Sequence, residues 1–599
     1  MNNEMPIFLD YLNYQTQYEG KYGKKTVVLI QVGGFFEFYG IDTRGHQQKI
    51  YEIAEILNMC VAITSKFYEV EKSNVLMAGF PLLALDKQLI ILIKHNYTVV
   101  LIEQTTEPPA VIERKVTNIY SPGTYLNALG YDSNNVLSLF ISQERDYKTK
   151  KINYIVGLSC IDLSTAKCHT HEIIGKPNDD DYIYEETLRF IQTFSPKEII
   201  LTYDEKSYMT NSLEKYVYEN KLPSKLDREQ RREFKKYIRK NILNTLENKL
   251  EFNENKIHVR QDLNNKDNRK MWYINEYLKK IYLNTGMLSP IQYISLDNAH
   301  NALFSFMTLL EFSYEHNENI LTNINKPVLY DNEDYLVLEN SAIQQLNIIS
   351  SNKENLSLFD VINYTTTSLG KRTLRERLLL PLIDENLINQ RYNNIDRFLE
   401  KTDTNDYKYL SIESHLTGII DIERYHRKMS LGIITPNEFY NLASTYDKII
   451  SLISCLQSNN IDELVPSDED IDNFQNYAMF YDSKIIIESC KEFNNVSDID
   501  RNIFKPNVNK TIENIQINID NNKNYMNDIC EVFDRILKKS LSPSDKPMKN
   551  SDKIKLLESG EDMKKGLEYC KINNSDKYGY YIGMTARRYE IIKSKNKIL

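Results

Sequence analysis

Val27–Gly40 has the sequence VVLIQVGGFFEFYG and joins an apolar run to two glycines and an aromatic segment. The run Val27–Val32 is rich in β-branched and apolar residues, which is typical of a buried strand. The segment Phe35–Tyr39 carries more rings than a surface loop needs, and one acid, Glu37, lies among them. We therefore predict an exposed aromatic tip at the end of a strand, which the rest of the chain presents to a partner.

Length and composition narrow the class of protein. At 599 residues the chain is long enough for several domains, because single cores stop growing near about 250–300 residues. Its formal net charge of −9 means that DNA binding would depend on local basic patches, not on a global positive field. Seven cysteines without a Cys-x-x-Cys pair favour a reducing intracellular compartment. No secretory signal is expected, and the longest apolar stretch, Leu76–Ile93, is too interrupted for a membrane helix.

The segment around the tip has the pattern of a small α+β domain, residues 1–124. Thr26–Val32 and Tyr97–Gln104 are predicted strands. Between them, leucines and isoleucines from Leu82 to Ile93 recur at helical spacing. The turn sequence Ser121-Pro122-Gly123-Thr124 is a plausible domain boundary.

Residues 125–265 are predicted to form an α/β layer domain. Strand patterns at Ile152–Asp162 and Ala166–Ile174 precede a helix pattern at Tyr184–Phe194 and a short strand at Glu198–Leu201. The stretch Lys225–Lys240 carries both signs of charge and is interpreted as a solvated helix face.

From residue 266 to 538 the pattern is helical. Thr435-Pro436-Asn437-Glu438 is a capping box with proline at the first helical position. Apolar residues from Ile512 to Ile536 predict a strut-like helix roughly 40 Å long. Residues 539–599 are mixed and include a strand-like run, Gly579-Tyr580-Tyr581-Ile582. The fold class is therefore multidomain, with α/β domains followed by an all-α region.

Catalytic and metal motifs are weak or missing in the sequence. Gly-Lys occurs four times, and none of these pairs has the flanking Gly and Ser or Thr of a Walker A loop, so ATP hydrolysis by residues 1–599 is not expected. No metal site is predicted at Cys168-His169-Thr170-His171, because Cys168 faces opposite to the histidines on a strand. Asp162 either contributes to a metal-dependent nuclease site, which needs several clustered acids, or caps a turn.

The aromatic tip has a physical use on DNA. An aromatic side chain can wedge between base pairs from the minor groove, and unstacking costs least where pairing is already faulty. Phe35 is the candidate wedge, and Glu37 would accept a hydrogen bond from a base edge or, if protonated, donate one. Two residues apart on a strand, they point to the same side. The alternative is that Phe35 and Phe38 are ordinary core residues on alternate faces.

Several motifs resemble one family. Gly33-Gly34-Phe35-Phe36-Glu37-Phe38-Tyr39 resembles the Gly-Asp-Phe-Tyr-Glu-Leu-Phe motif of the MutS mismatch-recognition proteins, with Gly34 in place of the acid. Further matches follow in the same order over nearly the whole chain: Met77-Ala78-Gly79-Phe80-Pro81, Glu103-Gln104 with Glu107-Pro108, Arg114 with Ser121–Thr124, Ser368–Arg372 with Pro381-Leu382, Asp421-Ile422-Glu423-Arg424 and Gly579-Tyr580-Tyr581. The Gly-Phe-Phe-Glu-Phe-Tyr sequence of the tip and the sequence Thr585-Ala586-Arg587-Arg588 resemble the branch seen in giant viruses and octocoral mitochondria.

The resemblance implies roles for each domain and for particular residues. Residues 1–124 would be the mismatch-binding domain, 125–265 a ribonuclease-H-like connector that is not a nuclease, 266–538 a helical core with levers, and 539–599 part of a β-rich clamp. The wedge role carries over to Phe35 and the base contact to Glu37. The residues expected to support the tip are Gly33, Gly34, Phe36, Met77 and Gly79. Candidate clamp contacts to the DNA backbone are Lys546, Lys549, Arg587 and Arg588, for which a solubilising surface is the alternative.

The resemblance also implies partners. The expected ligand is double-stranded DNA with mispairs or small loops. No cofactor is expected within residues 1–599, because ATP and Mg²⁺ belong to an ATPase domain that these residues lack, through a split gene or a truncated record. The chain alone would bind DNA but not switch, and a homodimer or a partner chain carrying the ATPase would complete it. A virion or viral factory is the expected location if the source is viral. Two alternatives remain: a connector-based nuclease that uses Asp162, and an inert truncated remnant.

Overall fold

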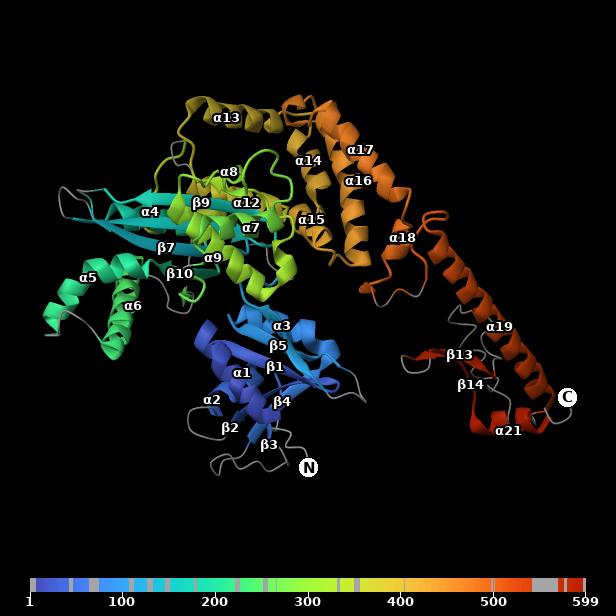
Figure 1. Ribbon diagram of the computed structural model, residues 1–599. Coiled ribbons are helices and arrows are strands. Elements are labelled where there is room, and N and C mark those ends of the chain that lie inside the picture. The colour runs from blue at the N-terminus through green and yellow to red at the C-terminus, as the bar shows by residue number, and fades with distance from the viewer. Residues whose placement is uncertain are drawn as a thin grey trace. The chain divides into compact units, whose positions relative to one another are not determined.

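The computed structural model describes residues 7–41, 47–63, 75–106, 112–126, 133–145, 151–176, 179, 181–220, 227–250, 257–264, 267–330, 334–349, 356–402, 405–496, 499, 501–540, 569–575 and 579–595. These residues form a mixed α/β fold, as the sequence predicts (Figure 1). The chain divides into two compact units. The first comprises Met1–Ile434 with Ser444–Pro466, and the second comprises Thr435–Ala443 with Ser467–Leu599.

The first sheet of the first unit, blue in Figure 1, has the strand order β3-β4-β2-β1-β5-β6. Its strands are β1 (Thr26–Val32), β2 (Phe35–Ile41), β3 (Ala62–Ile63), β4 (Val75–Pro81), β5 (Thr98–Gln104) and β6 (Arg114–Tyr120). The helices of the same segment are α1 (Ile7–Tyr22), α2 (Gln47–Ile56), η1 (Leu82–Ala84) and α3 (Leu85–Lys94). Strand β1 pairs antiparallel with β2 and parallel with β5, so it lies in the middle of the sheet.

The predicted strand and helix patterns of this segment are confirmed, and one interpretation is wrong. Phe35–Ile41 is a strand whose residues Phe36 and Phe38 are 2% and 1% exposed. This stretch therefore does not form an exposed aromatic cluster. The reason is strand alternation, which turns every second ring into the core and leaves only the intervening residues outside.

The second sheet, teal in Figure 1, has the order β11-β10-β7-β8-β9-β12. Its strands are β7 (Asn135–Arg145), β8 (Ile152–Asp162), β9 (Lys167–Ile174), β10 (Glu198–Tyr203), β11 (Ile257–Val259) and β12 (Val328–Leu329). The helices of this region are α4 (Tyr182–Phe194), α5 (Glu205–Glu219), α6 (Arg228–Leu250), α7 (Met271–Ile281), α8 (Pro290–Tyr293), α9 (His300–His316) and η3 (Glu318–Leu321). The predictions for β8, β9, β10 and α4 are confirmed, and the helical interpretation of the charged stretch agrees with α6.

Both faces of the second sheet are covered. On β7, Leu137 and Leu139 belong to a core shared with α4, α5 and α6, whereas Val136 belongs to the core shared with α7, α8 and α9. The core that contains Val136 also includes the apolar residues of the first sheet. Because successive side chains on a strand alternate, β7 serves two cores at once.

Helix α9 is apolar nearly all round, which is the pattern of a fully buried helix. Its first turn is held on the second sheet by Glu172, whose carboxylate accepts from the backbone N–H groups of Asn301 (2.6 Å) and Ala302 (3.0 Å). A carboxylate there also suits the positive end of the helix dipole. Further along, the Ser305 hydroxyl donates to the carbonyl of Ser138 at 2.8 Å.

One acid on α9 titrates unusually. Burial raises the pKa of Glu311 from its usual 4.5 to about 7, against hydrogen bonds from Asn268 (2.8 Å) and Tyr273 (3.4 Å) that lower it. Between these two values the folded state keeps a proton that the unfolded state has lost, so this group's contribution to stability falls as the pH rises.

Glu311→Gln removes this titration with little change in shape. As the pH rises from 4.5 to 8, we expect the free energy of unfolding of the variant to increase relative to that of the native protein by roughly 1–3 kcal/mol in total. The size follows because one pKa unit corresponds to about 1.4 kcal/mol. Urea unfolding of both proteins at pH 5 and pH 8 measures the difference. A difference that stays constant between the two pH values would contradict the assignment.

The remaining helices of the first unit form its all-α part. They are α10 (Asn340–Gln345), α11 (Leu358–Ile362), α12 (Ser368–Leu379), α13 (Glu385–Leu399), α14 (Lys408–Leu416), α15 (Ile422–Ser430) and η4 (Asp462–Leu464), with α16 (Pro436–Ser458) shared between the units. The capping box at the start of α16 is confirmed, because Thr435 N donates to Glu438 Oε2 (3.1 Å) and Glu438 N donates to Thr435 Oγ1 (3.3 Å).

The second unit is built around one long helix. Its elements are α17 (Asp468–Asp482), α18 (Ile487–Cys490), α19 (Lys510–Ser540), β13 (Lys571–Ser575), β14 (Gly579–Gly583) and α21 (Ala586–Lys595). The 31 residues of α19 confirm the predicted strut, with a length of roughly 46 Å. Strands β13 and β14 pair antiparallel, and α19 packs with them and with α21 in a small core. None of the helices in the described residues is long and apolar enough to cross a membrane.

Candidate functional site

The tip of the first sheet is the tight turn between β1 and β2. Val32 pairs with Phe35, so Gly33 and Gly34 alone make the connection. Gly33 has φ +60°, a left-handed conformation that two-residue hairpin turns require and that glycine adopts without strain. A Cβ on Gly34 would meet no atom within 4 Å, so this position has room for a side chain.

Phe35 and Glu37 lie on the same side of β2, as predicted from their spacing. Phe35 is 50% exposed at the first position of the strand, and Glu37 is half-buried. Phe36 faces the other way and packs behind them, with its ring 6.1 Å from the ring of Phe80. Single exposed apolar side chains are common on protein surfaces, so what distinguishes Phe35 is its place at the glycine turn on the same side of the strand as Glu37.

The glycine turn is braced by residues distant in sequence. Leu82 N donates to the Gly34 carbonyl at 3.1 Å. The carbonyl of Gln31, at the end of β1, accepts from Arg114 Nε at 3.0 Å, and its side-chain oxygen accepts from Gln104 N at 2.9 Å. These bonds hold the turn in one conformation, so little ordering entropy would be lost on binding a partner.

Two further tip residues lie on β4, the neighbour of β2. Gly79 pairs with Glu37, and a Cβ there would come 2.7 Å from the carbonyl oxygen of Phe36 and 3.1 Å from Glu37 Cγ. A larger residue would therefore displace β2 or the acid. Met77 pairs with Tyr39 on the same strand pair. The structure thus brings all the predicted tip residues together on one sheet.

Tyr39 is a site residue that sequence reasoning missed. Its hydroxyl donates a hydrogen bond to Glu37 Oε2. Burial and then Glu37 raise the pKa of the phenol, which therefore remains a donor at neutral pH. The ring is held edge-on against Tyr11 and Phe8, at centroid distances of 5.3 and 6.0 Å. The sequence contained a signal for this role, because a residue two positions after Glu37 on a strand lies on the same face as Glu37.

The candidate clamp residues belong to the second unit. Lys546 and Lys549 lie outside the described residues. Arg587 is exposed on α21. Arg588 is half-buried, donates to the carbonyl of Tyr569 at 2.9 Å and lies over the Tyr569 ring at 5.3 Å. Arg588 therefore has a packing role within this unit, whereas Arg587 is exposed.

Asp162 is bound in a turn. Its Oδ1 accepts from the backbone N–H of Ser164 (2.9 Å) and from the Ser164 hydroxyl (2.6 Å), which confirms the turn-cap interpretation. Cys168 and His169 lie on opposite faces of β9, as predicted: Cys168 is fully buried and the His169 ring lies 4.6 Å from the ring of Phe194. Within the described ranges, no three His, Cys, Asp or Glu side chains are grouped as a metal site requires.

Comparison with known proteins gives a consistent result. Residues 11–128, 138–290 and 341–574 match the models of MutS domain I, MutS domain II and MutS domain III. The mutS homologue of Acanthamoeba polyphaga mimivirus is 29% identical over 99% of this chain and 50% of its own length. The DNA mismatch repair protein MutS of Caldanaerobacter subterraneus subsp. tengcongensis is 25% identical over 77% of this chain and 45% of its own length. The mitochondrial DNA mismatch repair protein mutS homologue of Sarcophyton glaucum is 24% identical over 76% of this chain and 46% of its own length. The chain spans about half the length of these curated relatives.

Proposed function

The chain belongs to the MutS family, and from this premise we propose that residues 1–124 bind mispaired DNA, with Phe35 as a wedge and Glu37 as a contact to a base edge. One observation carries the proposal. Phe35 begins β2 at a braced glycine turn, remains 50% exposed and shares a face with Glu37. A ring and an acid are thus presented together at the end of a rigid sheet.

The wedge works through the deformability of DNA. Inserting Phe35 between base pairs opens a stack, which costs a few kcal/mol and least where a base is already mispaired. Stacking of a base on an aromatic side chain contributes about 1–3 kcal/mol in return. The balance favours insertion at a mispair and disfavours it in matched DNA, so the ring distinguishes the two without reading sequence.

Glu37 supplies a directed contact. A carboxylate near phosphates is repelled, so its presence requires a specific partner. Tyr39 occupies Oε2 of this carboxylate. That hydrogen bond orients the group and leaves Oε1 to accept from the exposed edge of a displaced base. The hydroxyl of Tyr39 is absent from the family motif that this stretch resembles, which has phenylalanine there, so this orientation is a property of the present chain.

Glu37→Ala tests the contact. We expect tighter binding to matched duplex, because a repelled charge is removed, and a loss of mismatch preference of about ten-fold, the size of one hydrogen bond to a charged group. Fluorescence anisotropy with a G·T duplex and its matched counterpart measures both quantities. Tyr39→Phe is the graded control, since it removes only the hydroxyl and should give a smaller loss. An unchanged ratio of the two affinities in Glu37→Ala would rule out the contact.

The other segments receive roles from the same premise. We assign residues 125–265 to the connector, 266–538 to the core and lever, and 539–599 to part of the clamp. The two covered faces of the second sheet support a ribonuclease-H-like layer arrangement, and the turn-cap role of Asp162 argues against a nuclease. Arg587 is the described clamp residue best placed for a phosphate contact, because it is exposed.

ATP-dependent switching and assembly concern the intact protein. Residues 1–599 contain no Walker A sequence, so the residues present do not fit ATP by that motif. We therefore assign switching to sequence outside these residues, carried by the same gene product or by a partner chain. A homodimer or such a partner, double-stranded DNA with mispairs or small loops, and a reducing intracellular setting complete the proposal.

A further inference from the structure

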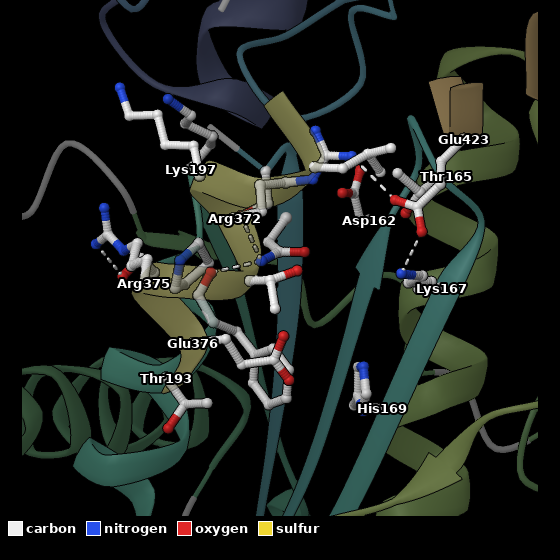
Figure 2. Close-up of a pocket in the computed structure, with 18 of the residues that line it drawn as sticks. Asp162, Thr165, Lys167, His169, Thr193, Lys197, Arg372, Arg375, Glu376 and Glu423 are labelled. Carbon is white, nitrogen blue, oxygen red and sulfur yellow. Dashed lines mark hydrogen bonds and ion pairs between the residues drawn. The ribbon is translucent and has the colours of Figure 1, made fainter. Parts of the chain in front are cut away.

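A pocket of about 500 Å³ lies between the second sheet and helix α12 (Figure 2). Its walls come from two parts of the chain that are far apart in sequence, residues 133–197 and residues 359–423. Its volume is within the roughly 300–1,000 Å³ that small-molecule sites have. The pocket is separate from the tip on the first sheet and shares no residue with it.

Positive charge dominates the pocket lining. Five lysines and arginines face three carboxylates, from Asp162, Glu376 and Glu423. The chain as a whole has a net charge of −9, so this local excess of positive charge is not a consequence of composition. Such a concave surface attracts anions. The five basic residues are Lys167, Lys197, Lys371, Arg372 and Arg375.

One side of the pocket is neutralised by its own ion pairs. Glu423 binds Lys167 Nζ at 2.6 Å and Arg372 Nη2 at 2.9 Å. Arg372 Nη2 also donates to Asp421 Oδ1 at 2.9 Å. These charges hold the wall together, and Figure 2 shows the Lys167–Glu423 pair at the right of the pocket.

Arg375 and Lys197 lie on the opposite side (Figure 2). Arg375 Nη2 donates to the hydroxyl of Ser195 at 2.9 Å, a neutral partner. Lys197 is exposed. Within the described part of the chain, neither of these two side chains forms an ion pair. A planar guanidinium and a second cation that line the same pocket can both bind phosphate oxygens. The hydroxyls of Ser195 and Thr193 already donate to the backbone carbonyls of Gln192 and Arg189, both at 2.9 Å, so the donors for an anion on this side are the two cations.

The floor of the pocket offers ring surfaces. His169 and Phe194 lie with ring centroids 4.6 Å apart and an interplanar angle of 30°. Burial, and then Lys167, lowers the pKa of His169 to about 4, so its ring is neutral near pH 7. This part of the pocket therefore supplies packing area, not further charge.

We propose that this pocket binds a small phosphate-bearing anion, whose oxygens accept hydrogen bonds from Arg375 and Lys197. Two sources share this chemistry: free inorganic phosphate, and a nucleoside monophosphate whose base would lie near the rings of His169 and Phe194. In either case the ligand contacts both the second sheet and α12, so its binding stabilises the packing of these two elements against each other.

Isothermal titration calorimetry with the 599-residue chain tests the site, with inorganic phosphate and adenosine monophosphate as probes at constant ionic strength in chloride. We expect saturable binding, and a Kd that is about ten-fold weaker in Arg375→Gln, because a charge-assisted hydrogen bond is lost. Lys197→Gln should weaken binding as well. Arg377→Gln is the matched control, since Arg377 is exposed on the same helix and does not line the pocket.

The affinities of the two probes distinguish the two possible ligands, inorganic phosphate and a nucleoside monophosphate. Equal affinities indicate a phosphate site, and a clearly tighter monophosphate indicates a nucleotide site; both support the proposal. No saturable heat with either probe would overturn it. An unchanged Kd in Lys197→Gln and Arg375→Gln would also overturn it. If Arg375→Gln does not fold, Lys197→Gln decides alone, because its exposed side chain contributes little to stability.

Discussion

Phe35→Ala is expected to remove most of the preference for mispaired over matched duplex and to leave folding intact. The ring is 50% exposed, so its loss takes little from the core. Its contribution on DNA is a stacking interaction of about 1–3 kcal/mol, which corresponds to roughly a 5- to 150-fold loss of affinity for the mispaired duplex. Binding to matched duplex should change little, because the ring is not inserted there.

The measurement is the ratio of dissociation constants for a G·T duplex and its matched counterpart, by fluorescence anisotropy. Leu83→Ala is the matched control. Leu83 belongs to the same domain and is fully exposed, so its removal also deletes apolar surface, yet it lies on η1 and not on β2. If Phe35→Ala keeps the native ratio, Phe35 is not the wedge, and an equal loss of the ratio in Leu83→Ala would mean that the effect is not specific to Phe35. Circular dichroism of both variants confirms that the fold is retained.

Gly157→Ala is expected to destabilise the first unit by roughly 3 kcal/mol or more, at the upper end of overpacking effects. An added Cβ would lie 2.0 Å from the carbonyl oxygen of Asn301 and 2.5 Å from Ala302 N. These are backbone atoms in the first turn of α9. The carboxylate of Glu172 accepts hydrogen bonds from the two backbone N–H groups of that turn. The helix therefore cannot move away from the sheet without breaking those bonds.

Thermal unfolding of Gly157→Ala, followed by circular dichroism, measures the effect as a lower midpoint. Gly20→Ala is the control, because Gly20 lies in α1 with no atom within 4 Å of an added Cβ. That change should be neutral or stabilising by up to about 1 kcal/mol, owing to the helix propensity of alanine. A midpoint for Gly157→Ala equal to that of the native protein would mean that α9 does not pack against β8 as described.

Local pattern was sufficient for most elements. The strands β1, β8, β9 and β10 and the helix α19 are predicted from the sequence, because their apolar residues form runs of strand length or recur at helical spacing. Strand β2 was harder. Its alternation correctly places Phe35 and Glu37 on one side, but alternation does not say which side is covered. The aromatic segment was therefore expected to be exposed as a whole, whereas Phe36 and Phe38 are core residues.

The sequence by itself determined the family, through motifs that occur in order along the chain, and the pairing of Phe35 with Glu37, through a two-residue strand period. Tertiary structure decided everything that depends on chain segments meeting from a distance. Gln104 and Arg114 hold the turn at Gly33-Gly34, and α12 meets the second sheet to enclose a cationic pocket. The physical reason is that periodicity is a property of neighbouring residues, whereas burial, bracing and charge clustering are properties of contacts between segments far apart in sequence.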